Sequence, residues 1–156
     1  MQKMISNILV FIIVLTTLNS CGYQKISISE QKFTIDEIEI NGDKRTSFLI
    51  KRKIERFSRE DGLNKLAISI NLGTKKNIHE KNIQNKVTKY KLSLTAETKI
   101  KDLKTFEVVK RSYSSNIIYN VGSRYTDTVK NEKEAKSELI DLIVNQLLDE
   151  LKINYN

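Results

Sequence analysis

Residues Val87–Ile100, with the sequence VTKYKLSLTAETKI, alternate between apolar and polar side chains along the whole stretch. One face would carry Tyr90, Leu92, Leu94, Ala96 and Ile100, and the other Lys89, Lys91, Ser93, Thr95, Glu97 and Lys99. A period of two residues is typical of a β-strand with one face buried and the other in water. We therefore expect this stretch to be a strand that covers a core on one side.

The residues before this strand predict a strand, a turn and a helix. Phe33–Ile40 alternates, with a change of phase at Asp36-Glu37 that indicates a bulge. Asn41-Gly42-Asp43 is a turn signal. Lys44–Arg59 then places apolar residues at helical spacing among lysines and arginines, which predicts an amphipathic helix with a basic outer face. The apolar positions are Leu49, Ile50, Ile54 and Phe57.

A further strand is expected at Leu66–Leu72, where apolar residues alternate with small polar ones up to Gly73. Residues 74–86 are polar, and we expect them to form a long hairpin loop. After the strand at 87–100, Lys101–Lys104 would turn the chain into a last strand at Thr105–Tyr119. Its phase slips between Val108 and Val109, as a second bulge would make it do.

The C-terminal part predicts a long helix that begins after a loop at Val121–Lys130. Asn131 followed by Glu134 resembles a capping box. The side expected to face the core carries Ala135, Leu139, Leu142, Ile143, Gln146, Leu147 and Leu151, widened by Ile140, Val144 and Leu148. Two helices on one face of a mostly antiparallel four-stranded sheet, in the order β-α-β-β-β-α, make a two-layer α+β sandwich.

Composition excludes several kinds of site. The 156 residues include one Cys and one His, which rules out an intramolecular disulfide framework and a Cys- or His-clustered metal site. His79 is expected to be an ordinary exposed loop histidine. The carboxylates Asp36, Glu37 and Glu39 fit solvated charges on an edge strand better than an acid pair, which needs a cleft. We expect no enzyme activity, no cofactor and no metal.

The N-terminus is typical of an exported lipoprotein. Residues 1–20 combine Lys3 with the apolar run Ile8–Leu18, which is too short to span a bilayer, and therefore predict a signal peptide. Leu18-Asn19-Ser20-Cys21 resembles a bacterial lipobox. The resemblance implies that Cys21 becomes the acylated mature N-terminus, with Gly22 favouring sorting to the outer membrane. The alternative is a signal peptide with an incidental Cys.

These observations divide the chain into a signal peptide at 1–20, a lipidated tether at 21–32 and a single domain at 33–156. The formal charge is +8, from 27 Lys and Arg against 19 Asp and Glu. Removal of the signal peptide takes away Lys3 alone, so the mature chain stays basic. Export directs this charge toward phosphates of the cell envelope instead of nucleic acid. For any one basic cluster, a merely solvated surface remains the alternative.

Taken together, the lipobox, the order of elements and several short motifs resemble the LptE family of lipopolysaccharide-assembly lipoproteins. The motifs are Cys21-Gly22-Tyr23, Lys89-Tyr90-Lys91-Leu92, Arg111-Ser112-Tyr113, Val129-Lys130-Asn131 with Glu134-Ala135, and Asn145-Gln146-Leu147 with Leu151. They extend over nearly all of the mature chain.

The resemblance implies an outer-membrane lipoprotein that plugs the β-barrel LptD, assists its assembly and binds lipopolysaccharide. It implies lipopolysaccharide-binding positions before the last helix, at Lys130, and in the preceding hairpin, near Lys81 and Lys86, with Lys91 also a candidate. One alternative is a free periplasm-facing lipoprotein that carries a small amphiphile. Another is a purely structural envelope lipoprotein.

Overall fold

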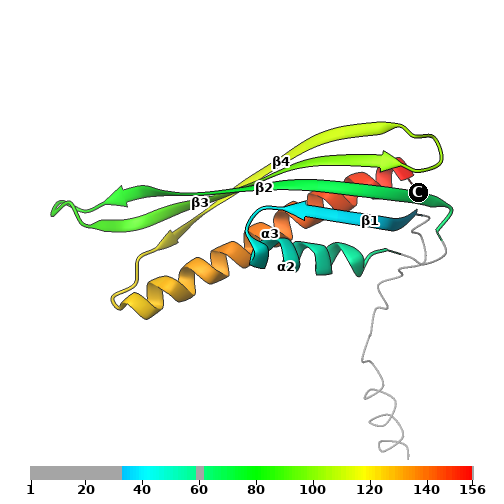
Figure 1. The fold of residues 1–156 in the computed structure, drawn as a ribbon. Helices are drawn as coiled ribbons and strands as arrows, with labels where there is room; N and C mark the ends of the chain where they lie inside the picture. The colour runs from blue at the N-terminus through cyan, green and yellow to red at the C-terminus, as the bar shows by residue number, and fades with distance from the viewer. Residues whose placement is uncertain (1–32, 59–61, 156) are drawn as a thin grey trace, which may run out of the picture.

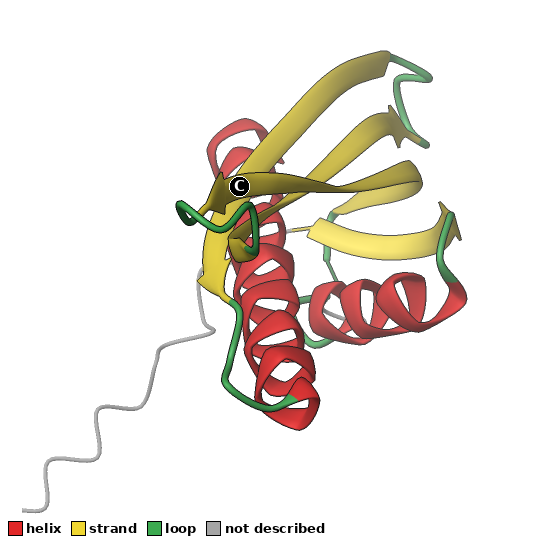
Figure 2. Ribbon diagram, turned by 90° about the vertical axis from the view of Figure 1, so that its left-hand side faces the viewer, coloured by secondary structure: helices red, strands yellow, loops and turns green. Residues whose placement is uncertain are grey.

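Four strands and two helices make up the fold in a computed structural model that describes residues 33–58 and 62–155 (Figure 1). Their order is β1 (Phe33–Asn41), α2 (Lys44–Glu55), β2 (Asn64–Lys81), β3 (Val87–Asp102), β4 (Val108–Asn120) and α3 (Tyr125–Tyr155). The strands form one sheet in the order β1-β2-β3-β4. β1 runs parallel to β2, and the other neighbours are antiparallel. Both helices cover the same face (Figure 2), so the predicted α+β sandwich is confirmed.

The alternation that predicts β3 is confirmed by burial. Leu94, Ala96 and Ile100 are each 1% exposed, whereas Thr95, Glu97 and Lys99 on the opposite face are exposed. Thr98 lies on the buried face as well and is 2% exposed. β3 therefore has one face in the core and one face that the helices leave uncovered.

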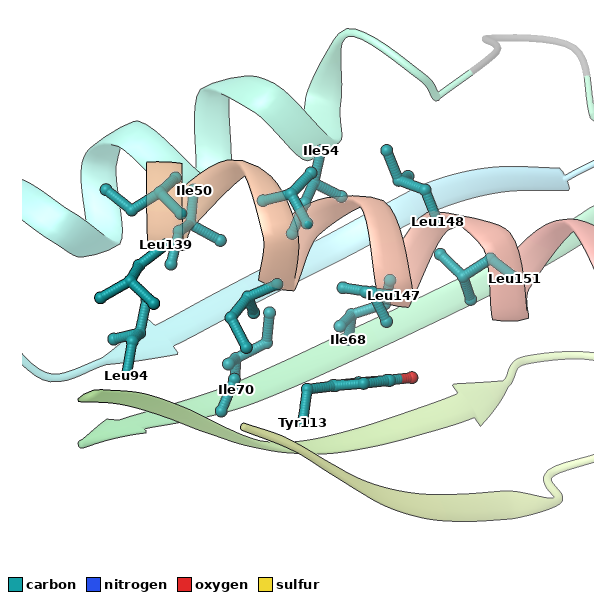
Figure 3. Close-up of a cluster of buried hydrophobic side chains, with 14 of the residues drawn as sticks. Ile50, Ile54, Ile68, Ile70, Leu94, Tyr113, Leu139, Leu147, Leu148 and Leu151 are labelled. Carbon is teal, nitrogen blue, oxygen red and sulfur yellow. The ribbon is translucent and has the colours of Figure 1, made fainter. Parts of the chain in front are cut away.

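The core lies between the sheet and the two helices (Figure 3). Ile50 and Ile54 of α2 pack near Leu139 and Leu148 of α3. The prediction that Leu142 and Gln146 also face the core is wrong, since both are exposed. α2 lies along the other side of α3, where Lys53 contacts Asp141 and Lys136 contacts Asp43. The buried stripe of α3 is therefore rotated toward Ile140, Val144 and Leu148.

The structure around β1 agrees closely with the prediction from the sequence. The pairing of β1 with β2 shifts register between Ile35 and Glu37, which confirms the bulge. Gly42 turns the chain with a φ of 139°, a conformation that favours glycine. The Asp43 carboxylate then caps α2 by accepting the Thr46 N–H at 3.1 Å.

Two predicted ends in the first half of the chain are wrong. α2 ends at Glu55 and does not continue to Arg59, because Ser58 turns away and its Oγ accepts the Ile35 N–H at 2.8 Å. Residues 74–86 are also not a loop. β2 continues to Lys81 and pairs with β3 as far as Val87, so that the turn is confined to residues 82–86. Residues 78–86, at the outer end of this hairpin, are all exposed, and most of their side chains are polar.

Two further boundaries differ from the expectation in the second half. β4 begins at Val108, and its register with β3 is unbroken to Asn120, so the slip at Val108 is no bulge. The turn before it lies at residues 103–107 instead of Lys101–Lys104. α3 begins at Tyr125, within the predicted loop. Its first turns bury no side chain in the core and show no apolar period, so the sequence pattern does not indicate them as helical. Asn131 does not begin the helix, and its side-chain amide donates to the Asn120 carbonyl at 2.9 Å.

Candidate functional site

The predicted lipidation site, Cys21, lies outside the described residues, as do the signal peptide at 1–20 and the tether at 21–32. Phe33, the first described residue, enters the sheet directly as the start of β1, paired with Asn64.

Lys81 and Lys86 flank the turn between β2 and β3, at the far tip of the hairpin that extends past the start of α3 (Figure 1). The Asn82 side-chain oxygen accepts the N–H groups of Gln84 and Lys86, each at 3.0 Å. The Lys81 ammonium donates to the Asn85 side chain at 2.9 Å. Hydrogen bonds within the turn therefore hold two exposed lysines at a defined tip.

Lys91 lies farther along the same hairpin, opposite Asn77 of β2 and Ile118 of β4. Its neighbours Tyr90 and Leu92 face the helices, so Lys91 points from the uncovered face of the sheet. A lysine in this position can meet a partner that covers the sheet.

Lys130 belongs to the first turns of α3, with its side chain 74% exposed and its ammonium 3.8 Å from Glu134. Glu132, two residues later, faces the sheet, so Lys130 points away from it. Lys91 and Lys130 thus project from opposite layers of the sandwich. The structure places Lys81, Lys86 and Lys91 along one hairpin and does not bring Lys130 into the same cluster.

A group of charged and aromatic residues near the start of α3 is not predicted as a group by the sequence. The Lys76 ammonium lies 2.5 Å from the Glu132 carboxylate and 4.4 Å from the centre of the Tyr90 ring. The Tyr119 hydroxyl donates to the same carboxylate at 2.9 Å. Lys76, Tyr90 and Glu132 border a cavity of about 330 Å³, also lined by Arg124. The sequence contains one indication of this group. Lys76 and Ile78 continue the alternating positions of Leu66–Leu72, which places Lys76 on the face of β2 that meets the helices.

Both charges in this group are stabilised by each other. Burial alone would lower the pKa of Lys76, but its contacts with Glu132 and Tyr119 outweigh burial and hold that pKa above its ordinary value. The hydrogen bond from Lys76 is the main cause of a lowered pKa for the Glu132 carboxyl. The pair is therefore ionised and nearly neutral overall, and it joins β2 to α3.

The other end of β4 carries a similar connection to α3. The Tyr113 hydroxyl donates to the Glu150 carboxylate at 2.6 Å, and the Arg111 guanidinium contacts the same carboxylate at 2.5 Å. Burial, followed by the bond to Glu150, raises the pKa of Tyr113 above its ordinary value. The Arg111-Ser112-Tyr113 motif thus has a structural role here, which is to hold the C-terminal half of α3 on the sheet.

The uncovered face of the sheet is broad, and its side chains are mostly small and polar. It carries Ala67, Ser69, Gly73, Ser93, Thr95, Ser112, Ser114 and Asn116, with Glu37, Glu39, Lys99, Lys101 and Lys110 around them. Two shallow hollows of about 330 and 260 Å³ lie on it, both lined in part by Lys99. Short hydroxyl and amide side chains present hydrogen-bonding groups close to the backbone, a surface suited to a polar partner.

The residues considered for other chemistry occupy ordinary surface positions. Asp36, Glu37 and Glu39 are exposed on the edge strand β1, and His79 is exposed on β2 instead of in a loop. Within residues 33–58 and 62–155, no group of three or more His, Cys, Asp or Glu side chains could hold a metal ion. Neither described helix is both long and apolar enough to cross a membrane.

The fold has relatives among solved structures of bacterial lipoproteins. The chain is similar to the rare lipoprotein B from Shewanella oneidensis, with a TM-score of 0.56 and 13% identity over 76% of this chain and 98% of that one. It is also similar to a protein from Caulobacter crescentus CB15 designated a lipoprotein, with a TM-score of 0.50 and 12% identity over 74% and 88% of the two chains. No protein-family model and no curated protein matches the sequence. The shared fold agrees with the resemblance to the LptE family of lipoproteins.

Proposed function

We propose that this chain is a non-enzymatic outer-membrane lipoprotein of the LptE type. In this proposal Cys21 carries the lipid anchor, and the folded part plugs an LptD-type β-barrel and assists its assembly. The same protein binds lipopolysaccharide for insertion into the outer leaflet.

The observation that carries the proposal is the uncovered face of the sheet. A sandwich of this kind buries one face of its sheet under helices and leaves the other for water or for a partner. Here that face is wide and shallow, and short polar side chains such as Ser93, Thr95 and Ser114 occupy much of it. The lumen of a large membrane barrel is itself polar, so such a face can lie against it through direct and water-mediated hydrogen bonds.

The lysines support the lipopolysaccharide part of the proposal. Lys81 and Lys86 extend from a hairpin tip, and Lys130 projects from α3 with its side chain 74% exposed. Exposed ammonium groups bind phosphate as mobile point charges. Because Lys91 and Lys130 point from opposite layers, lipopolysaccharide would contact them at two separate places and not in one pocket.

The cavity beside Lys76 is an observation that favours a carrier of a small amphiphile. Its cation is already paired with Glu132, and the space between sheet and helices is filled by closely packed side chains. A carrier needs an apolar cavity large enough for its ligand. The plug therefore agrees better with this fold.

The proposal is tested by two matched substitutions in a tagged chain. Ser114→Arg places a long cation on the uncovered face of the sheet, and Ser137→Arg places the same group on an exposed position of α3. We expect Ser114→Arg to reduce recovery of a large barrel protein from outer membranes, with Ser137→Arg and the unmodified chain recovering it equally. Equal recovery with all three would remove the uncovered face from the proposal.

A further inference from the structure

Phe106, in the turn between β3 and β4, has a backbone conformation that its side chain does not favour. Its φ is 60°, in the left-handed region, which is uncommon for a bulky residue. The corresponding residue in the hairpin turn at the other end of the sheet is Asn85, with a φ of 61°, and asparagine is well suited to that region. The Phe106 side chain is 70% exposed, so the core does not explain its presence either.

The turn itself is firmly built. The Phe106 N–H donates to the Asp102 carbonyl at 2.9 Å, and the Asp102 N–H donates to the Glu107 carbonyl at 3.0 Å. The Asp102 carboxylate also accepts the Lys104 N–H at 2.7 Å. An apolar ring is thus held in water on a rigid turn, and strained conformations of this kind are concentrated at functional positions.

This turn lies at the end of the sheet where β1 begins (Figure 1). The Leu103 N–H donates to the Lys65 carbonyl at 2.9 Å, next to the pair Phe33 and Asn64 that begins β1 and β2. We call this end of the molecule the tether end. The residues between Cys21 and Phe33 can span at most about 40 Å, so a lipid anchor at Cys21 would keep the tether end within that reach of the membrane.

The groups around Phe106 suit a lipid surface. The Lys101 ammonium lies 5.5 Å from the centre of the Phe106 ring, and Lys104 is exposed two residues before it. Leu63, just before β2, is 80% exposed at the same end. Aromatic side chains reside well at the depth of lipid head groups, and nearby lysines are attracted to anionic lipids.

We infer that the β3–β4 turn is a second membrane contact, in which Phe106 enters the head-group region of the leaflet that holds the anchor. Lys101 and Lys104 meet lipid phosphates beside it. This contact would orient the sheet relative to the membrane. The choice of leaflet rests on the lipid anchor of the proposed function, whereas the contact itself does not.

The chain contains no tryptophan, so a single introduced Trp reports on one position. Mature lipidated chains with Phe106→Trp or Ile83→Trp are bound to vesicles of phosphatidylethanolamine and phosphatidylglycerol with brominated acyl chains. Ile83 is fully exposed at the opposite hairpin and serves as the matched control. We expect quenching and a shift to shorter wavelength at position 106 and a water-like spectrum at position 83. No quenching at 106, or equal quenching at both positions, would overturn the inference.

The binding of a Cys21→Ser chain to the same vesicles makes the test independent of the anchor. Phe106→Asn should weaken this binding about tenfold, from the loss of a buried aromatic group, without lowering the stability of the fold. Lys104→Gln should weaken it about fivefold, and have no effect on phosphatidylcholine vesicles. Equal binding by all three chains would contradict the inference.

Mass spectrometry of the N-terminal peptide shows whether Cys21 is lipidated. It therefore tests the proposed lipid anchor independently of the inferred membrane contact. Unmodified Cys21 would contradict the lipid anchor, and quenching of the Phe106→Trp chain would still stand as evidence for the membrane contact. A lipidated Cys21 without quenching of the Phe106→Trp chain would support the anchor and overturn the contact.

Discussion

The connection of Tyr113 to Glu150 gives a sharp test of how α3 is held on the sheet. Tyr113→Phe removes the hydroxyl that donates to the Glu150 carboxylate at 2.6 Å and leaves the buried ring in place. Glu150 keeps its contact with Arg111, so no buried charge loses its last partner.

The expected loss follows from the kind of hydrogen bond. A bond to a charged group contributes about 1.5–3 kcal/mol, and the lower end applies here because Glu150 retains Arg111 and is partly exposed to solvent. We therefore expect Tyr113→Phe to lower the free energy of unfolding by about 1.5 kcal/mol. For a domain of this size, that corresponds to a fall in Tm of about 6 °C.

Thermal and denaturant unfolding of the wild type and the variant measure this difference. Tyr125→Phe is the matched control, because Tyr125 is 83% exposed and should tolerate the change. A Tyr113→Phe variant as stable as its Tyr125→Phe control would refute the reasoning.

The pH dependence provides a second check. The pKa of Tyr113 is raised in the fold, so the unfolded chain loses this proton first, and stability declines as the pH rises above the ordinary tyrosine value of 10. Tyr113→Phe should make that alkaline decline shallower. An equally steep decline in the variant would show that Tyr113 contributes nothing to it.

Other parts of the structure give three further predictions. Lys130→Glu should weaken lipopolysaccharide binding and leave barrel association intact, with Lys133→Glu on the same helix as the control; equal binding by both variants would remove Lys130 from the site. Gly62→Ala should destabilise the fold by about 2 kcal/mol in denaturant unfolding, because its new Cβ would lie 2.4 Å from the Phe33 carbonyl carbon. The pKa of Glu132 is lowered in the fold, so its ionised form stabilises the fold above the ordinary carboxyl pKa, and this stability is lost as the pH falls through the folded pKa. Glu132→Gln should therefore make the free energy of unfolding fall less steeply with decreasing pH in acid.

The sequence predicts those parts of the fold in which one face is buried and the other is in water. β3 is of this kind. The bulge in β1 and the start of α2 at Lys44 are indicated by a change of phase and by the turn residues before the helix. The same reasoning fails for residues 74–81, which form a strand with polar residues on both faces. It fails for the first turns of α3 for the same reason.

The candidate site is less predictable because it depends on contacts between distant residues. Lys76 meets Glu132 from another element, and in the sequence it is one lysine among many. Leu142 and Gln146 have the spacing of core residues, yet the position of α2 turns them outward. In contrast, Arg111 and Tyr113 are recognisable in the sequence as a motif. Their shared contact with Glu150 is visible only in the structure.

Affinity purification of the tagged mature chain from outer membranes tests the plug most directly. The proposal predicts recovery of a large β-barrel protein in about equal amount with the chain, at a level that survives detergent washing. Recovery of the chain without any large barrel partner would contradict the proposal, whatever its affinity for lipopolysaccharide.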